Sequence, residues 1–289
     1  MPILESTNRH ADFNRKKLAE IKDLTGDLAG WEFSQEKDGV KLYSKQVEGS
    51  SIPLVRGDYI LKNTDFTAQQ VATVATLPGC RAIWDEKFHS AEVREMFTRW
   101  ESLFWVRTNT PWPVSNRDVS GCNLRDFTTD LSYVAMASVQ DDLVPEVSGC
   151  VRGNLITSGW KCEKVEDGIL IVYVSQIDLA GSIPTSFLRS VQMQMPLCAG
   201  KVAEYTAAYG FPPVALDSSC VYKLESFDHA KRTHTLQLDG QGHIQYQFSS
   251  KMYPNGVQIK TSTGSSQVEG NIITVSDING PTTVVISKA

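Results

Sequence analysis

The sequence has 289 residues, of which 41% are hydrophobic, and its formal net charge is −5. A chain of this length and composition buries a sizeable core. The acidic balance, without a basic cluster, argues against a nucleic-acid-binding protein and against permanent docking on anionic membranes. The polar N-terminus and short apolar runs predict a soluble, cytoplasmic protein. Six cysteines without a CxxC pair predict reduced, packed thiols, with no metal site and no cofactor.

The first elements predicted along the chain are one helix and three strands. Apolar residues recur at helical spacing over residues 7–28, and Gly30 ends this helix. Its apolar face needs a sheet to cover. Alternating apolar and polar residues then predict strands at 31–34, 40–47 and 54–61, the first two joined as a hairpin by the turn 37–39.

Two short helices and a long run of strands follow. Asp65 is expected to cap a helix that runs to about Leu77, and Pro78 starts a second one. Strands are then predicted at 89–97, 99–108, 116–125, 132–139, 151–163 and 168–178. A long helix begins at Pro184 and ends at Tyr209. This order predicts an α+β fold in which a long antiparallel sheet bends around the C-terminal helix.

The predicted C-terminal helix has an unusual composition for a core element. Small residues such as Ala199 and Gly200 alternate with Met193 and Met195, and Pro196 interrupts the helix. Thioether side chains adapt to irregular apolar guests, and a proline inside a helix provides a bending point for a lid. The same composition also suits an ordinary core helix with a kink.

Residues after about Leu216 predict a small all-β unit. Short runs with alternating or β-branched residues lie at 221–227, 233–238, 243–248, 257–261, 271–276 and 282–286. We therefore divide the chain into residues 1–216 and 217–289. Two prolines in the connector stiffen it, so the β-unit should dock against the first domain as a support or as a site of protein contact.

Several strings in residues 5–212 together resemble the START family of lipid transfer domains. They include Trp84-Asp85, the block PWPVSNRD at 111–118, Ser158-Gly159-Trp160 and the block DLAGSIP at 178–184. The resemblance implies a helix-grip fold with a lipid-sized tunnel between the sheet and the C-terminal helix. It also implies that this helix and a loop at 126–131 gate the tunnel. Arg117 and Asp118 of the central block we interpret as a structural ion pair.

The resemblance also suggests residues that contact a lipid head group. In the phosphatidylcholine-binding branch of the family, an arginine three residues before the Trp-Asp pair contacts the phosphate, and Arg81 stands at that place. Guanidinium stays charged and offers a fork of donors. Allowing one inserted residue, Trp105 matches a tryptophan of the choline-binding cage. The alternatives are a helical ion pair between Arg81 and Asp85 and an ordinary packing role for Trp105.

The choice between phospholipid and sterol stays open, with phospholipid ahead. Val119 and Ser175 stand where the other cage aromatics would fall, and Asn123 stands where the sterol-binding branch has a tunnel arginine. We expect a lipid partner, brief membrane contact and the following ligand-binding residues: Arg81, Trp84, Asp85, Trp105, Asn123, Met136, Tyr173, Ser175, Phe187, Val191, Met195, Ala199 and Val202.

An enzyme is the competing class, since helix-grip relatives include cyclases. Catalysis needs a general acid or base near the substrate, and the five histidines form no recognisable catalytic arrangement. We therefore expect a binding protein without catalytic residues. A lipid sensor is a third possibility, because a bound lipid can report rather than travel.

Overall fold

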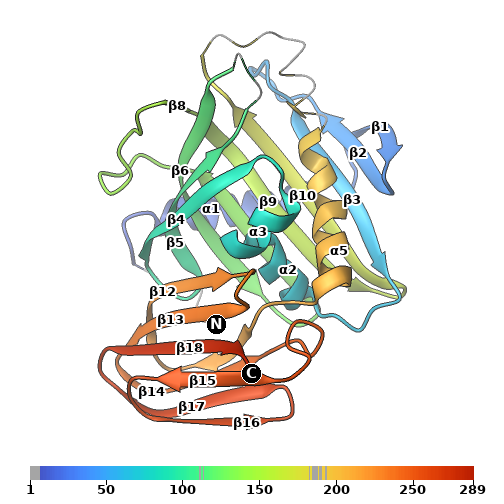
Figure 1. Cartoon of the computed structure of the whole chain (residues 1–289). Coiled ribbons are helices and arrows are strands. Elements are labelled where there is room, and N and C mark those ends of the chain that lie inside the picture. Colours follow the sequence, from blue (N-terminus) through green and yellow to red (C-terminus); the bar gives the residue numbers. More distant parts are fainter. Residues whose placement is uncertain are drawn as a thin grey trace.

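The computed structural model describes residues 7–110, 112, 114–181, 183, 188, 191–192 and 194–289. Within them, one long sheet follows the path β1-β2-β3-β10-β9-β7-β6-β5-β4, antiparallel at each step. Its strands are β1 (Glu32–Lys37), β2 (Val40–Lys45), β3 (Leu54–Lys62), β4 (Phe88–Met96), β5 (Glu101–Thr108), β6 (Asn116–Phe127), β7 (Leu131–Ser138), β9 (Asn154–Val165) and β10 (Gly168–Asp178). The sheet curves around helices on its inner face, as the α+β prediction requires (Figure 1).

One predicted strand is divided in the structure. Residues 151–163 predict a single strand, but β8 (Cys150–Arg152) pairs in parallel with β6, whereas β9 pairs antiparallel with β7 and β10. Between them, the Gly153 N–H donates to the Asp118 carbonyl oxygen at 2.8 Å. The chain changes its partner strand at this glycine, so the prediction of one continuous strand is wrong.

Helix α1 (Ala11–Leu24) covers the outer face of the sheet and lies behind it in Figure 1. It is shorter than the predicted helix at both ends. Its buried Leu18 and Ile21 pack against Leu124 and Ala135. Gly159 permits this close approach, because a Cβ there would lie 2.6 Å from Cγ1 of Ile21. Direct packing therefore closes this face of the sheet.

Helices α2 (Ala68–Thr76) and α3 (Pro78–Trp84) cover the inner face (Figure 1). The prediction that Asp65 caps α2 is wrong, since Thr67 is the capping residue. Its hydroxyl accepts from the Gln70 N–H at 3.2 Å, and the Gln70 side chain accepts from the Thr67 N–H at 3.0 Å. This reciprocal pair satisfies two helix-end donors, which a lone aspartate two residues earlier does not.

The C-terminal helix is interrupted at the predicted proline. Residues Met195–Leu197 form a single 3₁₀ turn, and α5 (Cys198–Tyr209) follows it. Pro196 has no N–H to donate within a helix, and its carbonyl oxygen packs against Gly57, where a Cβ would lie 2.3 Å away. Ala199, Val202 and Ala203 are buried in the core. The described part of this helix is thus fixed closely to the sheet.

The C-terminal residues form two four-stranded sheets within the described chain, ordered β11-β14-β17-β16 and β12-β13-β18-β15. Their strands are β11 (Val214–Ser218), β12 (Val221–Asp228), β13 (Thr233–Asp239), β14 (Gln241–Gln247), β15 (Val257–Thr261), β16 (Ser265–Glu269), β17 (Ile272–Asn279) and β18 (Thr282–Lys288). The pattern predicted six of these strands and missed β11 and β16. Every residue of β16 is exposed, so it has no apolar alternation to detect.

The β-unit docks directly on α2, α3 and the large sheet (Figure 1). Gln69 donates to the Ala215 carbonyl oxygen at 2.7 Å, and Gln70 donates to the Gln247 side chain at 2.9 Å. Gly79 packs so tightly that a Cβ would lie 1.8 Å from the Phe227 carbonyl oxygen. One hydrophobic cluster runs through both units. The β-unit is therefore held in place, as its stiff connector predicts.

Candidate ligand cavity

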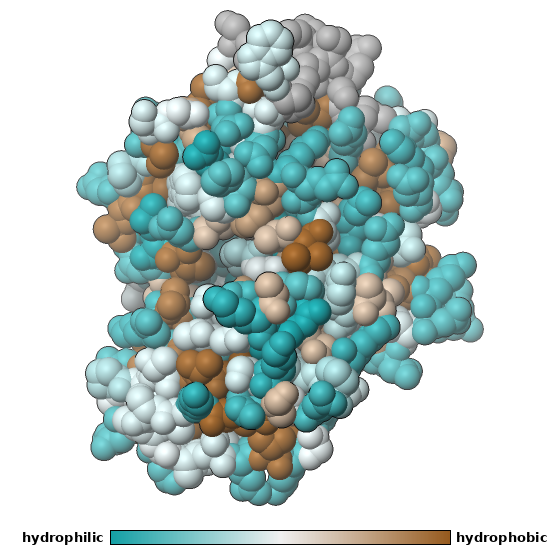
Figure 2. Space-filling view, in the orientation of Figure 1, coloured by the Kyte–Doolittle hydropathy of each residue, from teal (hydrophilic) through white to brown (hydrophobic). Residues whose placement is uncertain are grey.

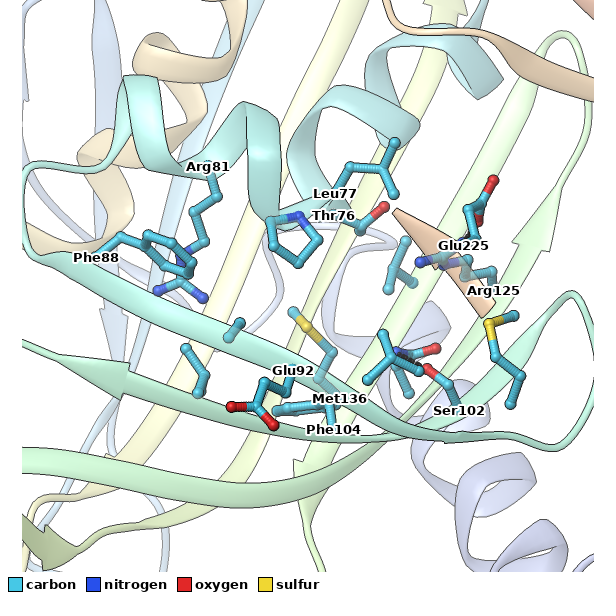
Figure 3. A pocket seen from close by; sticks show the side chains of 17 residues that line it. Thr76, Leu77, Arg81, Phe88, Glu92, Ser102, Phe104, Arg125, Met136 and Glu225 are labelled. Carbon is cyan, nitrogen blue, oxygen red and sulfur yellow. Dashed lines mark hydrogen bonds and ion pairs between the residues drawn. The ribbon is translucent and has the colours of Figure 1, made fainter. Parts of the chain in front are cut away.

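A cavity of about 70 Å³ lies between the inner face of the sheet and the junction of α2 and α3 (Figure 3). The β-unit contributes one wall residue. The lining residues are Thr76, Leu77, Pro78, Arg81, Phe88, Ala91, Glu92, Val93, Met96, Ser102, Phe104, Val106, Asn123, Arg125, Val134, Met136 and Glu225. Most of them are apolar, and the charged side chains of Arg81, Arg125 and Glu225 lie toward two different ends.

Strand alternation explains which side chains reach the cavity. On β5, Ser102, Phe104 and Val106 face inward, while the residues between them face the outer side. The same alternation places Asn123 and Arg125 on one face of β6 and Met136 on that face of β7. Asn123 Nδ2 donates to Ser102 Oγ at 2.8 Å, which joins two neighbouring strands. Of the predicted site residues, Arg81, Asn123 and Met136 are thus brought together.

Arg81 occupies one end of the cavity, on α3. Its Nε donates to Asp85 Oδ2 at 2.9 Å, and its guanidinium lies 5.4 Å from the Phe88 ring centroid. The Arg81 side chain is 33% exposed and Asp85 is 18% exposed. The helical ion pair that the spacing suggested is therefore present, and the same arginine also faces the cavity.

The other end carries a charged pair that the sequence did not suggest. Arg125 Nη1 lies 3.2 Å from Glu225 Oε2, and their side chains are only 13% and 11% exposed. Glu225 Oε1 also lies 3.3 Å from Nε2 of the fully buried His234. Burial raises the pKa of Glu225, but His234 and Arg125 together outweigh it and lower that pKa to about 2. Glu225 belongs to β12, so the β-unit completes this end of the cavity.

The two predicted tryptophans pack rather than face the cavity. Trp105 lies on the outer side of β5, where its Nε1 donates to Asp118 Oδ2 at 2.8 Å and its ring packs with Leu103, Cys122 and Val144. Trp84 donates to the Val74 carbonyl oxygen at 3.3 Å. Phe104, one residue before Trp105, is the aromatic residue of β5 that faces the cavity. The inserted residue assumed in the motif match shifts the side chain to the opposite face.

The remaining predicted residues lie outside the cavity wall. Tyr173 accepts a hydrogen bond from Ser158 at 3.0 Å, and burial raises its pKa to about 12. Ser175 is fully buried, and its hydroxyl has no hydrogen-bond partner. Ala199 and Val202 are core residues of α5, and Met195 and Val191 are half-buried. Phe187 lies outside the described residues.

Arg117 and Asp118 do not pair with each other, because successive residues of a strand point to opposite faces. Arg117 donates to the carbonyl oxygens of Leu179 and Ala180 at 2.8 and 3.0 Å. Asp118 instead lies 2.8 Å from Arg152 on β8. The two sequence blocks at 111–118 and 178–184 are therefore linked in space by Arg117. The roles remain structural, although the predicted partners are wrong.

In the described part of the chain, no helix is both long enough and apolar enough to span a membrane. The same residues contain no cluster of three or more histidine, cysteine or acidic side chains arranged for a metal ion.

Comparisons by sequence agree with the motifs. The START domain family profile matches residues 12–201, and the strands of the β-unit follow this match. An uncharacterized protein of Pseudomonas aeruginosa is 26% identical over 175 residues, which covers 58% of this chain and 81% of that protein.

Solved structures share the fold of the same region. Human STARD10 aligns with a TM-score of 0.60 at 19% identity, over 67% of this chain and 80% of that one. Human StAR-related lipid transfer protein 5 aligns with a TM-score of 0.58 at 22% identity, over 68% and 97%. A fragment of the STAR-related lipid transfer protein from Xanthomonas axonopodis aligns with a TM-score of 0.51 at 26% identity, over 60% and 96%. The helix-grip fold expected from the motifs is confirmed.

Proposed function

The chain belongs to the START domain family, and on that premise we propose that it binds one lipid molecule in the cavity and carries it through water. The observation that supports this proposal most directly is a mostly apolar cavity, with Arg81 at one end, Arg125 and Glu225 at the other, and the exposed Glu92 between them. Met96 and Met136 are among its lining residues, and their flexible thioethers adapt to chains of varied shape. Most of the lining is apolar, which suits the binding of a lipid.

A phospholipid with a phosphatidylcholine-like head group is the first candidate ligand, and a sterol is the second. Guanidinium groups at both ends of the cavity support the phospholipid, since arginine binds phosphate through paired donors. The hydrogen-bonded Asn123 and Ser102 side chains support the sterol, because a hydroxyl group matches such partners.

Ligand entry requires the walls to part, because small-molecule sites hold about 300–1,000 Å³ and this cavity holds about 70 Å³. The resemblance assigns the gate mainly to the C-terminal helix, and we keep that assignment with the turn at Pro196 as the bending point, although no described residue of this helix lines the cavity. We assign the smaller part of the gate to the loop at 126–131. Its Thr129 carbonyl oxygen accepts from the Ala68 N–H at 2.8 Å, which fastens the loop to α2.

Membrane contact is assigned to the loop that carries Trp112, whose side chain is 91% exposed. Tryptophan prefers the membrane–water interface. On the face shown in Figure 2, hydrophobic residues are interspersed with hydrophilic ones, which supports a brief contact at one loop rather than a broad one. The six free cysteines support a reducing, cytoplasmic location.

Transfer between two vesicle populations tests this function. We expect the protein to accelerate exchange of phosphatidylcholine, and native mass spectrometry to find one lipid per chain. Val106→Phe should fill the cavity and reduce transfer, whereas Val268→Phe on exposed β16 should not. Binding without accelerated exchange would indicate a sensor instead. A protein that stays unliganded after incubation with phosphatidylcholine and sterol vesicles would contradict the proposal.

A further inference from the structure

A second, smaller cavity of about 20 Å³ lies at the seam between the large sheet and the β-unit. Arg125 and Glu225 line both cavities, so their ion pair is the partition between them. The other lining residues are Gln69, Thr73, Arg99, Trp100, Phe127, Pro213, Val214, Ala215, Tyr222 and Tyr246. The proposed lipid cavity therefore continues toward the seam once this pair moves aside.

Three side chains of the seam cavity carry buried hydrogen-bond donors that have no partner. Arg99 Nη1, Trp100 Nε1 and Arg125 Nε are all buried without a hydrogen-bond partner. Each of these groups can donate and none can accept. An unpaired buried donor destabilises a folded protein, and such groups are rare. Three such donors around one small space suit a ligand group that accepts hydrogen bonds.

The charges of the seam cavity point to the same kind of ligand. Two arginines, Arg99 and Arg125, line it against one carboxylate, Glu225, which leaves one positive charge in excess. The Arg99 guanidinium lies 4.3 Å from the Trp100 ring centroid, which holds it beside the Trp100 donor. The Tyr246 hydroxyl donates to the Tyr222 hydroxyl at 2.9 Å, and burial raises the pKa of Tyr222 to about 12, so neither tyrosine supplies the missing negative charge at neutral pH.

We propose that the seam is an oxyanion site, in which Arg99, Trp100 and Arg125 bind a carboxylate or phosphate group. The lipid source of that group rests on the proposed function: the head group lies at the seam and the chain lies in the adjoining apolar cavity. Glu225 then selects against a second negative charge on the ligand. Arg81 is less suited to the head group, because Asp85 already accepts from it and one third of its side chain is exposed.

Two single-chain lipids and one soluble anion test the site in the full-length protein. Oleate and oleyl alcohol share a chain and differ in the charged head, and inorganic phosphate has no chain. Trp100→Phe removes one donor while it keeps the ring, and Arg99→Met removes the charge while it keeps the stem. Arg107→Met is the matched control, since Arg107 Nε is also buried without a partner but lines neither cavity. Arg81→Met tests the other end of the cavity.

We expect Arg99→Met to weaken oleate binding about 10-fold and Trp100→Phe to weaken it severalfold, with oleyl alcohol affinity unchanged. Arg107→Met should leave oleate affinity within about twofold. Phosphate binding that Arg99→Met abolishes would support the oxyanion site even if no lipid binds, in which case the lipid function alone fails. Equal affinity for oleate and oleyl alcohol, or loss of oleate binding with Arg81→Met but not with Arg99→Met, would overturn the site.

Discussion

The large sheet and the β-unit are both built mainly from antiparallel strands, yet they differ in how completely their interiors are packed. The β-unit buries Leu236, Leu238 and Ile244 in its core. The large sheet packs α1 against its outer face but leaves a cavity on its inner face. The β-unit closes one end of this cavity, because Glu225 on β12 forms part of the cavity wall.

The largest expected effect comes from breaking the charged pair between the two regions. Glu225→Leu leaves Arg125 as a buried charge without its partner, and we expect a loss of about 4 kcal/mol in the free energy of unfolding. The double variant Arg125→Met, Glu225→Leu should recover most of that loss, because it removes both charges. Urea unfolding of the four proteins in this cycle measures the coupling. A double variant as unstable as the single one would show that the pair matters only for packing.

The same pair predicts how stability depends on pH. The pKa of Glu225 falls from 4.5 to about 2 on folding, so the folded state binds the proton more weakly than the unfolded state. The stabilisation is complete above about pH 4.5 and is lost as the pH falls toward 2, by up to about 3 kcal/mol. Glu225→Gln should flatten the stability profile in this window. Identical profiles for the two proteins between pH 7 and pH 2.5 would contradict the lowered pKa.

Truncating one apolar residue in each region compares the two interiors directly. Leu236→Ala in the filled β-unit should cost about 3 kcal/mol, because a cavity opens in a closely packed core. Met136→Ala should cost only about 1 kcal/mol, since this half-buried side chain already borders empty space. Chemical denaturation gives both values. If Met136→Ala costs as much as Leu236→Ala, the inner face of the sheet is not loosely packed.

The tight contact at Gly79 tests how rigidly the regions are joined. Gly79→Ala places a Cβ against the backbone of Phe227, which cannot yield as a side chain end does, so we expect a loss of about 2 kcal/mol. Gly153→Ala is the control, because its Cβ would meet no atom nearer than 3.4 Å. The melting temperatures of the two variants, measured by thermal unfolding, test this difference. Equal melting temperatures would mean that the seam can shift to admit the methyl group.

The smallest effect concerns Trp105, which packs on the outer face. Trp105→Phe removes the hydrogen bond to Asp118 and should cost about 1.5 kcal/mol. Lipid transfer per folded molecule should not change, because the side chain does not reach the cavity. A fall in transfer that exceeds the fall in stability would restore the head-group role that the motif suggested.

The motifs predicted the fold of the first region well, because they mark turns and strand starts that recur in a fixed order. The position of each strand side chain was harder to predict. A slip of one residue along β5 separates Trp105 from Phe104, and it decides which aromatic ring faces the cavity. Sequence spacing alone does not resolve such a slip.

The ion pair of Arg125 and Glu225 could not be predicted from the sequence, for a different reason. The two residues are 100 positions apart, and Glu225 lies in a region that local patterns present as a separate unit. Long-range contacts of this kind leave no periodic trace in either segment. The unpaired donors of Arg99 and Trp100 likewise become visible only when the surrounding atoms are in place.

The position of β18 in its sheet has a consequence for biosynthesis. Residues 282–288 pair with both β13 and β15, so the four-stranded sheet that carries Glu225 is complete only after these residues have left the ribosome. Until then, the START region has most of its own strands but lacks one wall of its cavity. A chain that exposes such a partly enclosed apolar surface binds chaperones or aggregates. Closure of the cavity and docking of the β-unit should therefore occur together, in a step that follows the synthesis of β18.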